Sequence, residues 1–295
     1  MEIRVQQPKT IINRNVHHFG FDATFNPYRG CSHACKYCYA RDTHQFFNLD
    51  RGHDFERIIF AKEFTGAQVM DQLSRVPLSQ TIAIGTATDP YQPIEGQLRI
   101  TRKFLQAILL SGHGVTITTK SPLVLRDLDL ITALAIRQQI VVHISLITDN
   151  TTLAHQLEPG TSSPRRRWQI VDGLVAQQVP VALFCAPIIP GWTDDLETLN
   201  AIFATARQKR VTWLMAAPVH FTPPMFEYFS AHLATIDATR TLTFRRHFAD
   251  NGALLPWYRR QLQQTIDRLR GQYHLSEQGL TPRPHQFTVQ TVFDI

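Results

Sequence analysis

Short apolar segments rich in β-branched residues return along the chain at intervals of about 25 to 40 residues. Each has the pattern of a strand that is buried on both faces, as in a parallel sheet. We predict six such strands, over residues 21–25, 81–85, 115–119, 141–147, 179–186 and 211–217. Helical patterns lie between them, over residues 68–73, 101–110, 123–137, 164–177 and 194–208. This alternation restricts the chain to an α/β fold in which right-handed crossovers build a parallel sheet.

The number of repeats distinguishes between the α/β architectures. Six strand–helix units are too few for a closed eight-stranded barrel, so we expect a partial (β/α)6 TIM-like barrel with parallel strands. A doubly wound sheet remains the alternative, because periodicity does not distinguish the two. In both architectures ligands bind at the carboxyl ends of the strands. Short segments that follow the strands lie at those ends, over residues 86–88, 119–121 and 188–190.

The pattern changes after Pro218, where aromatic and helical segments replace the strand–helix rhythm. These segments cover residues 221–229, 241–248 and 257–270, and the last of them is rich in Arg and Gln. We therefore divide the chain into an N-terminal arm (1–20), a partial-barrel core (21–220) and a C-terminal helical extension packed on the core (221–295).

Composition places the chain among globular proteins. Of its 295 residues 43% are hydrophobic and 18% are charged, which provides enough apolar side chain for a core and excludes disordered and collagen-like classes. The first residues have neither the apolar core nor the cleavage site of a signal peptide. Apolar runs stay well below the roughly 18 residues of a membrane span. We therefore expect a soluble, cytoplasmic protein.

Three of the four cysteines, Cys31, Cys35 and Cys38, fall within eight residues. A disulfide framework would be spread along the chain, so this grouping indicates a metal or iron–sulfur site. Three thiolates from one loop can hold three irons of a [4Fe–4S] cluster, which ordinarily takes four cysteines. The remaining iron is then free to chelate S-adenosylmethionine (SAM) through its amino and carboxylate groups, which is a route to radical chemistry.

Two other interpretations of the cysteines remain. A zinc site with three cysteines and His33 or His44 is one, although structural zinc usually takes paired ligands from two separated turns. Three buried structural thiols are the other. Apolar burial, however, does not require three cysteines in one polar loop that also contains His33 and Lys36.

The segment from Asn26 to Arg41, which begins NPYRGC and ends CYAR, resembles the radical SAM superfamily. Within that superfamily the chain resembles the branch related to spore photoproduct lyase, a light-independent DNA repair enzyme. The likeness covers about residues 21 to 217 and includes GTATDPYQPIE at 85–95, TKSP at 119–122, LEP at 157–159 and RRR at 165–167. It implies that Cys31, Cys35 and Cys38 ligate the cluster.

The resemblance also implies cofactor contacts near the cysteines and at the end of the second strand. Tyr37 would lie beside the adenine of SAM, and Thr88 and Asp89 would contact the amino group of its methionine. A carboxylate suits an ammonium group at that position. The structural interpretations are aromatic packing for Tyr37 and an Asp-Pro turn for Asp89.

Further contacts follow from the later strands. Lys120 resembles the family lysine that reaches the polar groups of the cofactor, and Ser145 resembles the serine that contacts its ribose. Arg167 would pair with the cofactor carboxylate, because a guanidinium matches a carboxylate bidentately. The structural interpretations are a solvated loop lysine, a buried serine bonded to backbone and a surface arginine run.

Two positions bear on how a radical reaction would end. Spore photoproduct lyase would have a hydrogen-donating cysteine at the end of the second strand, where this chain has Thr86. An O–H bond is much stronger than an S–H bond, so Thr86 is a poor hydrogen-atom donor and repair by the usual route is in doubt. Cys185 lies in an apolar strand, where a small structural side chain is the default interpretation and a hydrogen donor is the alternative.

These observations predict an enzyme that cleaves SAM reductively to a 5′-deoxyadenosyl radical, which abstracts hydrogen from an unidentified substrate. A flavodoxin- or ferredoxin-type protein would supply the electron, and the sequence assigns no further catalytic residue. Two non-enzymatic alternatives remain. One is a zinc-containing nucleic-acid-binding protein, and the other is an iron–sulfur electron-transfer or sensory protein.

Charge adds a candidate substrate class. The net charge is +6, and many arginines are grouped, at residues 165–167, 245–246, 259–260, 268 and 270. With Trp257 and Tyr258 they could form part of a basic, aromatic groove for a nucleic acid, so a nucleic-acid lesion or base is one candidate substrate. Basic helices that are simply solvated are the alternative.

Overall fold

The computed structural model describes residues 1–14, 22–249, 251–276 and 281–284, so Phe21 of the first predicted strand lies outside the described residues. Within these ranges the main sheet has seven strands, in the order β10-β9-β8-β7-β6-β3-β2. Their bounds are Ile12–Arg14 (β2), Ala23–Phe25 (β3), Ile82–Ile84 (β6), Val115–Thr119 (β7), Ile140–Ser145 (β8), Val181–Ile188 (β9) and Trp213–Pro218 (β10).

The strand order settles the architecture. The strands from β3 to β10 follow one another in chain order and all pair in parallel. A doubly wound sheet would reverse its strand order at a switch point, and this sheet has no reversal among the described strands. The six predicted strands and the partial barrel are therefore confirmed. β2 adds an antiparallel edge strand beside β3.

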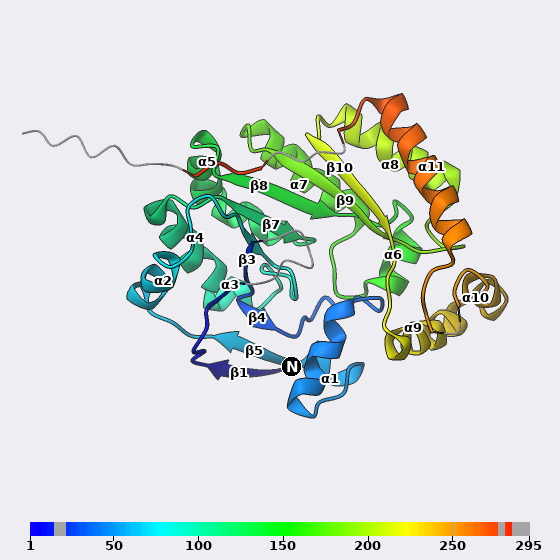
Figure 1. The fold of residues 1–295 in the computed structure, drawn as a ribbon, viewed down its shortest axis with the longest axis horizontal. Helices are drawn as coiled ribbons and strands as arrows, with labels where there is room; N and C mark the ends of the chain where they lie inside the picture. Colours follow the sequence, from blue (N-terminus) through cyan, green and yellow to red (C-terminus); the bar gives the residue numbers. More distant parts are fainter. Residues whose placement is uncertain (15–21, 250, 277–280, 285–295) are drawn as a thin grey trace, which may run out of the picture.

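Helices cover the outer face of this sheet (Figure 1). They are α2 (Gly66–Leu73), α4 (Ile100–Ser111), α5 (Leu128–Ile136), α7 (Pro164–Ala176) and α8 (Leu196–Gln208), with the 3₁₀ helix η3 (Pro122–Asp127) before α5. Two short helices, α3 (Glu95–Leu98) and α6 (Thr151–Leu157), lie in the connections that follow β6 and β8. Local caps fix several of their starts. The Ser163 hydroxyl accepts the Arg166 amide at the start of α7, and the Asp195 carboxylate accepts the Thr198 amide at the start of α8.

One predicted helix is divided. Residues 123–137 form η3 and then α5, which meet at Asp127 and Leu128. The Asp127 carboxylate is buried and accepts hydrogen bonds from Tyr91, Arg102 and Arg126, so its position is set by these partners. Asp127 has φ −101° and ψ 21°, outside the α-helical region.

A second, smaller sheet lies beside the barrel. Its order is β1 (Glu2–Gln6), β5 (Ile58–Lys62) and β4 (Tyr28–Arg29). The 3₁₀ helix η2 (Tyr39–Phe47) and the helix α1 (His53–Arg57) connect β4 to β5. The sequence did not predict β1, because four of its five residues are exposed and only pairing with β5 holds it.

The C-terminal extension is helical, as predicted, over α9 (Pro223–Ile236), α10 (Ala238–Arg245) and α11 (Pro256–Tyr273). It packs around a group of phenylalanines, of which Phe229 and Phe244 are fully buried. Figure 1 shows α11 alongside α8 at the β10 edge of the sheet. Within the part of the chain that the structure describes, no helix has the length and apolar character to cross a membrane.

Candidate active site

The three grouped cysteines lie in a loop that follows β4. Its first residue, Gly30, has φ +83°, and a Cβ there would lie 2.7 Å from the carbonyl oxygen of Ile58, so glycine is required. The amide of Cys31 donates to the carbonyl oxygen of Phe55 at 3.0 Å. Cys31 and Cys35 are buried and Cys38 is half-buried. The start of the loop is therefore fixed to α1 by the hydrogen bond to Phe55, and β4, which precedes the loop, pairs with β5.

Arg41 holds the other end of this loop, and sequence reasoning gave it no role. Its fully buried guanidinium donates to the carbonyl oxygens of Ala34 at 2.9 Å, Cys35 at 2.8 Å and Gly52 at 2.9 Å. A planar group with several fixed donors can satisfy such a set of carbonyls, whereas a lysine could not. The signal in the sequence was an arginine three residues after the last cysteine of the group.

The segment after β6 packs on the start of the loop. The Thr88 hydroxyl donates to the carbonyl oxygen of Gly30 at 2.8 Å. The Gln92 amide group donates to the Thr88 hydroxyl at 3.0 Å and accepts the Ser32 amide at 3.0 Å. Gln92 is fully buried, and no role for it was predicted from the sequence. Thr88 thus lies beside the cysteine loop, and its contact with SAM stays a prediction.

Asp89 joins the ends of β6 and β7 to the cysteine loop. Its carboxylate accepts the Thr119 hydroxyl at 2.7 Å and the Lys120 amide at 2.8 Å, and it lies 3.1 Å from Nδ1 of His33. Burial raises the pKa of Asp89, but the interaction with His33 and these hydrogen bonds outweigh burial and lower the pKa to about 2. The carboxylate is therefore ionised at neutral pH.

Glu158, which follows α6, gathers the remaining predicted residues. Its buried carboxylate accepts hydrogen bonds from the Tyr37 hydroxyl and the Arg167 guanidinium, and it lies 3.9 Å from the Lys120 ammonium. Arg167 also donates to the carbonyl oxygen of Ser145 at 3.1 Å. Burial raises the pKa of Glu158, but Arg167 and Lys120 outweigh it and lower the pKa overall. Tyr37, Lys120 and Arg167 therefore meet around one carboxylate, and Ser145 is linked to this group through its backbone carbonyl.

Burial changes the pKa of all three thiols in the same direction. Burial raises the pKa of Cys31 to about 12 and also raises those of Cys35 and Cys38, so ligation must release their protons. In the described part of the chain, no three His, Cys, Asp or Glu side chains converge as ligands of one ion. Zinc needs four donors around one point, whereas each thiolate of a cluster binds its own iron.

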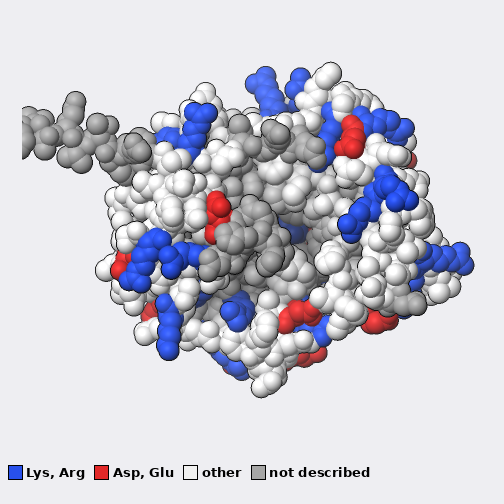
Figure 2. All heavy atoms as spheres, in the orientation of Figure 1, with Lys and Arg blue, Asp and Glu red and all other residues white. Residues whose placement is uncertain are grey.

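The inner face of β7 to β10 is uncharged where its side chains are described. His143 stacks on Phe184 with ring centroids 4.3 Å apart, and both contact Trp213 edge-on. Burial lowers the pKa of His143 to about 3, so its ring is neutral. Phe184, Trp213 and Met215 keep part of their surface accessible. Figure 2 shows the molecule hollowed near the middle of this view.

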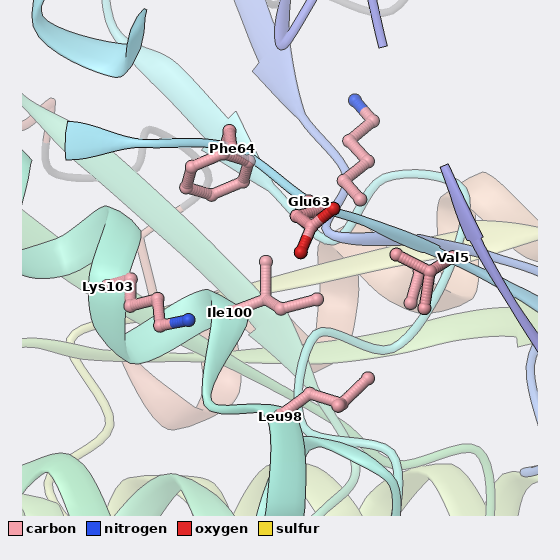
Figure 3. A pocket seen from close by; sticks show the side chains of 8 residues that line it. Val5, Glu63, Phe64, Leu98, Ile100 and Lys103 are labelled. Carbon is pink, nitrogen blue, oxygen red and sulfur yellow. The ribbon is translucent and has the colours of Figure 1, made fainter. Parts of the chain in front are cut away.

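A recess away from the cysteines lies between the small sheet and α4 (Figure 3). Val5, Phe64, Leu98 and Ile100 supply its apolar surface, with Glu63 and Lys103 at its edge. None of these residues belongs to the predicted site. A second recess includes Asp149, Arg165, Trp168 and Lys209 in its lining, and it contains none of the predicted site residues either.

A family model for the radical SAM superfamily matches residues 25–202, more than half of the chain. The chain belongs to this superfamily. The protein is therefore a radical SAM enzyme, and its superfamily implies SAM and an iron–sulfur cluster as cofactors. The matched residues include the cysteine loop and every strand from β4 to β9.

Relatives and solved structures agree with this assignment. An uncharacterized protein of Mycobacterium bovis is 31% identical over 87% of this chain and 76% of its own length. One of Methanocaldococcus jannaschii is 30% identical over 59% of this chain and 63% of its own length. Spore photoproduct lyase complexed with dinucleoside spore photoproduct has a TM-score of 0.67 at 17% identity, covering 92% of this chain and 79% of that one. A variant of that lyase with bound AdoMet has a TM-score of 0.66 at 16% identity over the same shares.

The similarity to spore photoproduct lyase confirms the predicted fold. In our protein, the Thr86 hydroxyl accepts a hydrogen bond from the Asn26 side-chain amide at 2.9 Å. Cys185 is fully buried in the main apolar core. It lies next to Phe184 in β9, and neighbouring residues of a strand point to opposite faces, so Cys185 faces the covering helices. This placement agrees with the structural interpretation of Cys185.

Proposed function

We propose that this radical SAM enzyme holds a [4Fe–4S] cluster on Cys31, Cys35 and Cys38 and abstracts hydrogen from a nucleic-acid base or lesion. The observation that carries the proposal is the attachment of the cysteine loop to the carboxyl ends of β6 and β7. Thr88, Asp89 and Gln92 make that attachment within hydrogen-bond distance. Carboxyl ends of barrel strands are where such folds bind ligands.

The chain's own residues would bind and orient the cofactor. When bound, the cluster would supply the electron that cleaves SAM to the 5′-deoxyadenosyl radical. Thr88 and Asp89 would hold SAM on the side of β6, and Tyr37, Lys120, Ser145 and Arg167 on the side of β7 and β8. Glu158 keeps Arg167 and Tyr37 in place, because its carboxylate bonds to both of them.

A positively charged surface supports a nucleic-acid substrate. Residues 238–273 hold seven arginines and two aspartates, whereas the rest of the chain holds 23 basic and 22 acidic residues. Arg246, Arg259 and Arg260 are exposed, and basic side chains are visible over α11 in Figure 2. Arginines of this kind bind phosphates regardless of base sequence. The excess charge of the protein therefore lies almost entirely in this segment.

An exposed aromatic side chain accompanies these arginines. Trp257, at the start of α11, keeps 48% of its surface exposed and lies 5.5 Å from the His247 ring. Bases of single-stranded nucleic acid stack on such rings. The uncharged inner face around Phe184 also suits a base better than a phosphate, because burying an unpaired charge is costly. A nucleic acid with its phosphates on the arginine-rich segment and one base at the inner face of the sheet is consistent with both surfaces.

Reconstitution without oxygen tests the proposed function. Protein incubated with iron, sulfide and a reductant should hold about four irons and four sulfides, and dithionite with SAM should then yield 5′-deoxyadenosine. Replacing Cys31, Cys35 or Cys38 by Ala should abolish that product, whereas Cys185→Ala should retain it. Zinc without sulfide in oxygen-free preparations would overturn the proposal. Irradiated DNA, tRNA and cell extract are the substrates to screen for increased product.

A further inference from the structure

A row of side chains crosses β7, β8, β9 and β10, which lie side by side in the main sheet (Figure 1). Thr118, His143, Ala182 and Trp213 are partners in the register of these strands. Register partners of parallel strands point to the same face of the sheet, so the four side chains form one row. Phe184 follows Ala182 by two residues in β9 and therefore lies in the next row on that face. We call Thr118, His143, Ala182 and Trp213 the inner row, because this face is turned away from the covering helices.

Two ring nitrogens in the inner row have no hydrogen-bond partner within the described ranges. Nε1 of Trp213 is buried and meets no acceptor there. Nδ1 of His143 lies 3.3 Å from the Thr118 hydroxyl oxygen, and no described residue hydrogen-bonds to its Nε2. A buried N–H without an acceptor is costly and rare in folded proteins. The inner row therefore has hydrogen-bonding capacity that the described protein groups leave unused.

Aromatic surfaces border these nitrogens. The His143 ring stacks on Phe184 with centroids 4.3 Å apart, and the Trp213 ring meets both edge-on at 5.5 and 5.6 Å. Phe184 and Trp213 are half-buried, whereas only 4% of His143 is exposed. The inner row contains no acidic or basic side chain other than His143, and burial lowers the pKa of His143 to about 3, so the row is uncharged at neutral pH. A flat, uncharged ring with hydrogen-bonding atoms on its edge matches this surface.

We propose that His143 and Trp213 hydrogen-bond to the edge of the substrate's nucleobase and determine which base the enzyme accepts. The inference rests on the proposed function and adds the residues that recognise the base. An indole N–H only donates, so the base must offer a carbonyl oxygen or a ring nitrogen to Trp213, and the neutral His143 ring donates or accepts according to its tautomer. A base removed from its stack is recognised by aromatic surfaces and edge hydrogen bonds of this kind. Ser145, the predicted ribose contact of SAM, lies two residues after His143 on the same face.

Comparison of a labelled oligothymidylate with an abasic chain of the same length tests the inference, because the two probes share their phosphates and differ only in the bases. Thymine has two carbonyl oxygens that can accept from Trp213. In fluorescence anisotropy with reconstituted protein, Trp213→Phe and His143→Phe should each lower the ratio of the two affinities by about threefold to tenfold. Both replacements keep an aromatic ring, and an unchanged affinity for the abasic chain would show that the variants are folded.

Trp168→Phe is the matched control. It also removes an indole N–H, but from α7 on the outer side of the sheet, where Trp168 donates to Asp149 at 2.8 Å. The control should keep the wild-type ratio. A ratio that is unchanged in both inner-row variants, or that falls equally in the control, would overturn the inference. Wild-type protein that binds both probes equally would overturn it as well.

Cofactor cleavage without substrate separates this inference from the proposed function. With dithionite and SAM alone, both inner-row variants should contain wild-type iron and form 5′-deoxyadenosine at the wild-type rate, because they lack only contacts to a base. A loss of iron or of this product in both variants would place His143 and Trp213 in the cofactor site and would refute base recognition. Wild-type protein that forms no 5′-deoxyadenosine would refute the proposed function, and the affinity ratios would still decide whether the inner row binds a base.

Discussion

The amide of Gly160 donates a hydrogen bond to the carbonyl oxygen of His33 at 3.0 Å, so two loops that are far apart in the sequence pack backbone to backbone. A Cβ on Gly160 would lie 2.1 Å from the Ser32 carbonyl oxygen and 2.9 Å from the His33 Cα. Neither atom is the end of a flexible side chain. Glycine is therefore required here for the cysteine loop to reach its position.

Gly160→Ala should displace the cysteine loop. We expect less iron per reconstituted protein and a loss of about 1–3 kcal/mol in the free energy of unfolding, as for other overpacked sites. Gly271→Ala is the control, because a Cβ there meets no atom within 4 Å and alanine favours the helix by up to about 1 kcal/mol. Iron analysis and urea unfolding measure the two effects. Full iron content in the Gly160 variant would show that the contact is unimportant.

Glu158→Gln should destabilise the fold strongly. The Arg167 guanidinium is 1% exposed, and the substitution would leave its charge without a buried partner, at a cost of about 3–5 kcal/mol. Glu227→Gln is the control, because Glu227 pairs with Arg245 at 2.9 Å on the surface and such pairs contribute about 0–1 kcal/mol. Urea unfolding at pH 7 measures the loss in the free energy of unfolding for both variants. Equal losses in the two variants would contradict the importance of the buried pair.

His143 should make stability depend on pH. Its pKa is lowered from 6.5 to about 3 by burial, so between these values the unfolded chain binds a proton that the folded protein does not. Its contribution is complete above pH 6.5 and is lost as the pH falls towards 3, by about 1.4 kcal/mol per pH unit within that window. His143→Gln should remove this slope. Unfolding between pH 4.5 and 6.5 is the measurement, and identical slopes in both proteins would contradict it.

Arg260→Glu should weaken nucleic-acid binding and its dependence on salt. If Arg260 contacts one phosphate, the slope of log K against log salt should fall by about 0.7–0.9 in magnitude, with a further change from the added negative charge. Arg75→Glu is the control, because it changes the net charge by the same amount at a site just after α2. Arg75 pairs there with Asp71 at 2.6 Å. Fluorescence anisotropy with a labelled single-stranded oligonucleotide at several salt concentrations compares them. Equal effects would indicate that only net charge matters.

The sequence by itself determined the features that depend on local pattern. The six strands were predicted because β-branched apolar runs report burial on both faces of a sheet. Cys31, Cys35 and Cys38 were identified as candidate ligands because all three lie in one short loop. Residues 123–137 were predicted as one continuous helix, but the structure divides them at Asp127. The local pattern did not reveal that the buried Asp127 forms an ion pair with Arg102.

Only the tertiary structure decided how the site is held together. Tyr37 and Glu158 are 121 residues apart in the chain, and Ser32 and Gln92 are 60 apart, yet each pair is hydrogen-bonded. The sequence around a buried carboxylate or amide does not distinguish it from an exposed one. Its role depends on which partners the folded chain brings within about 3 Å, and that is a property of long-range packing.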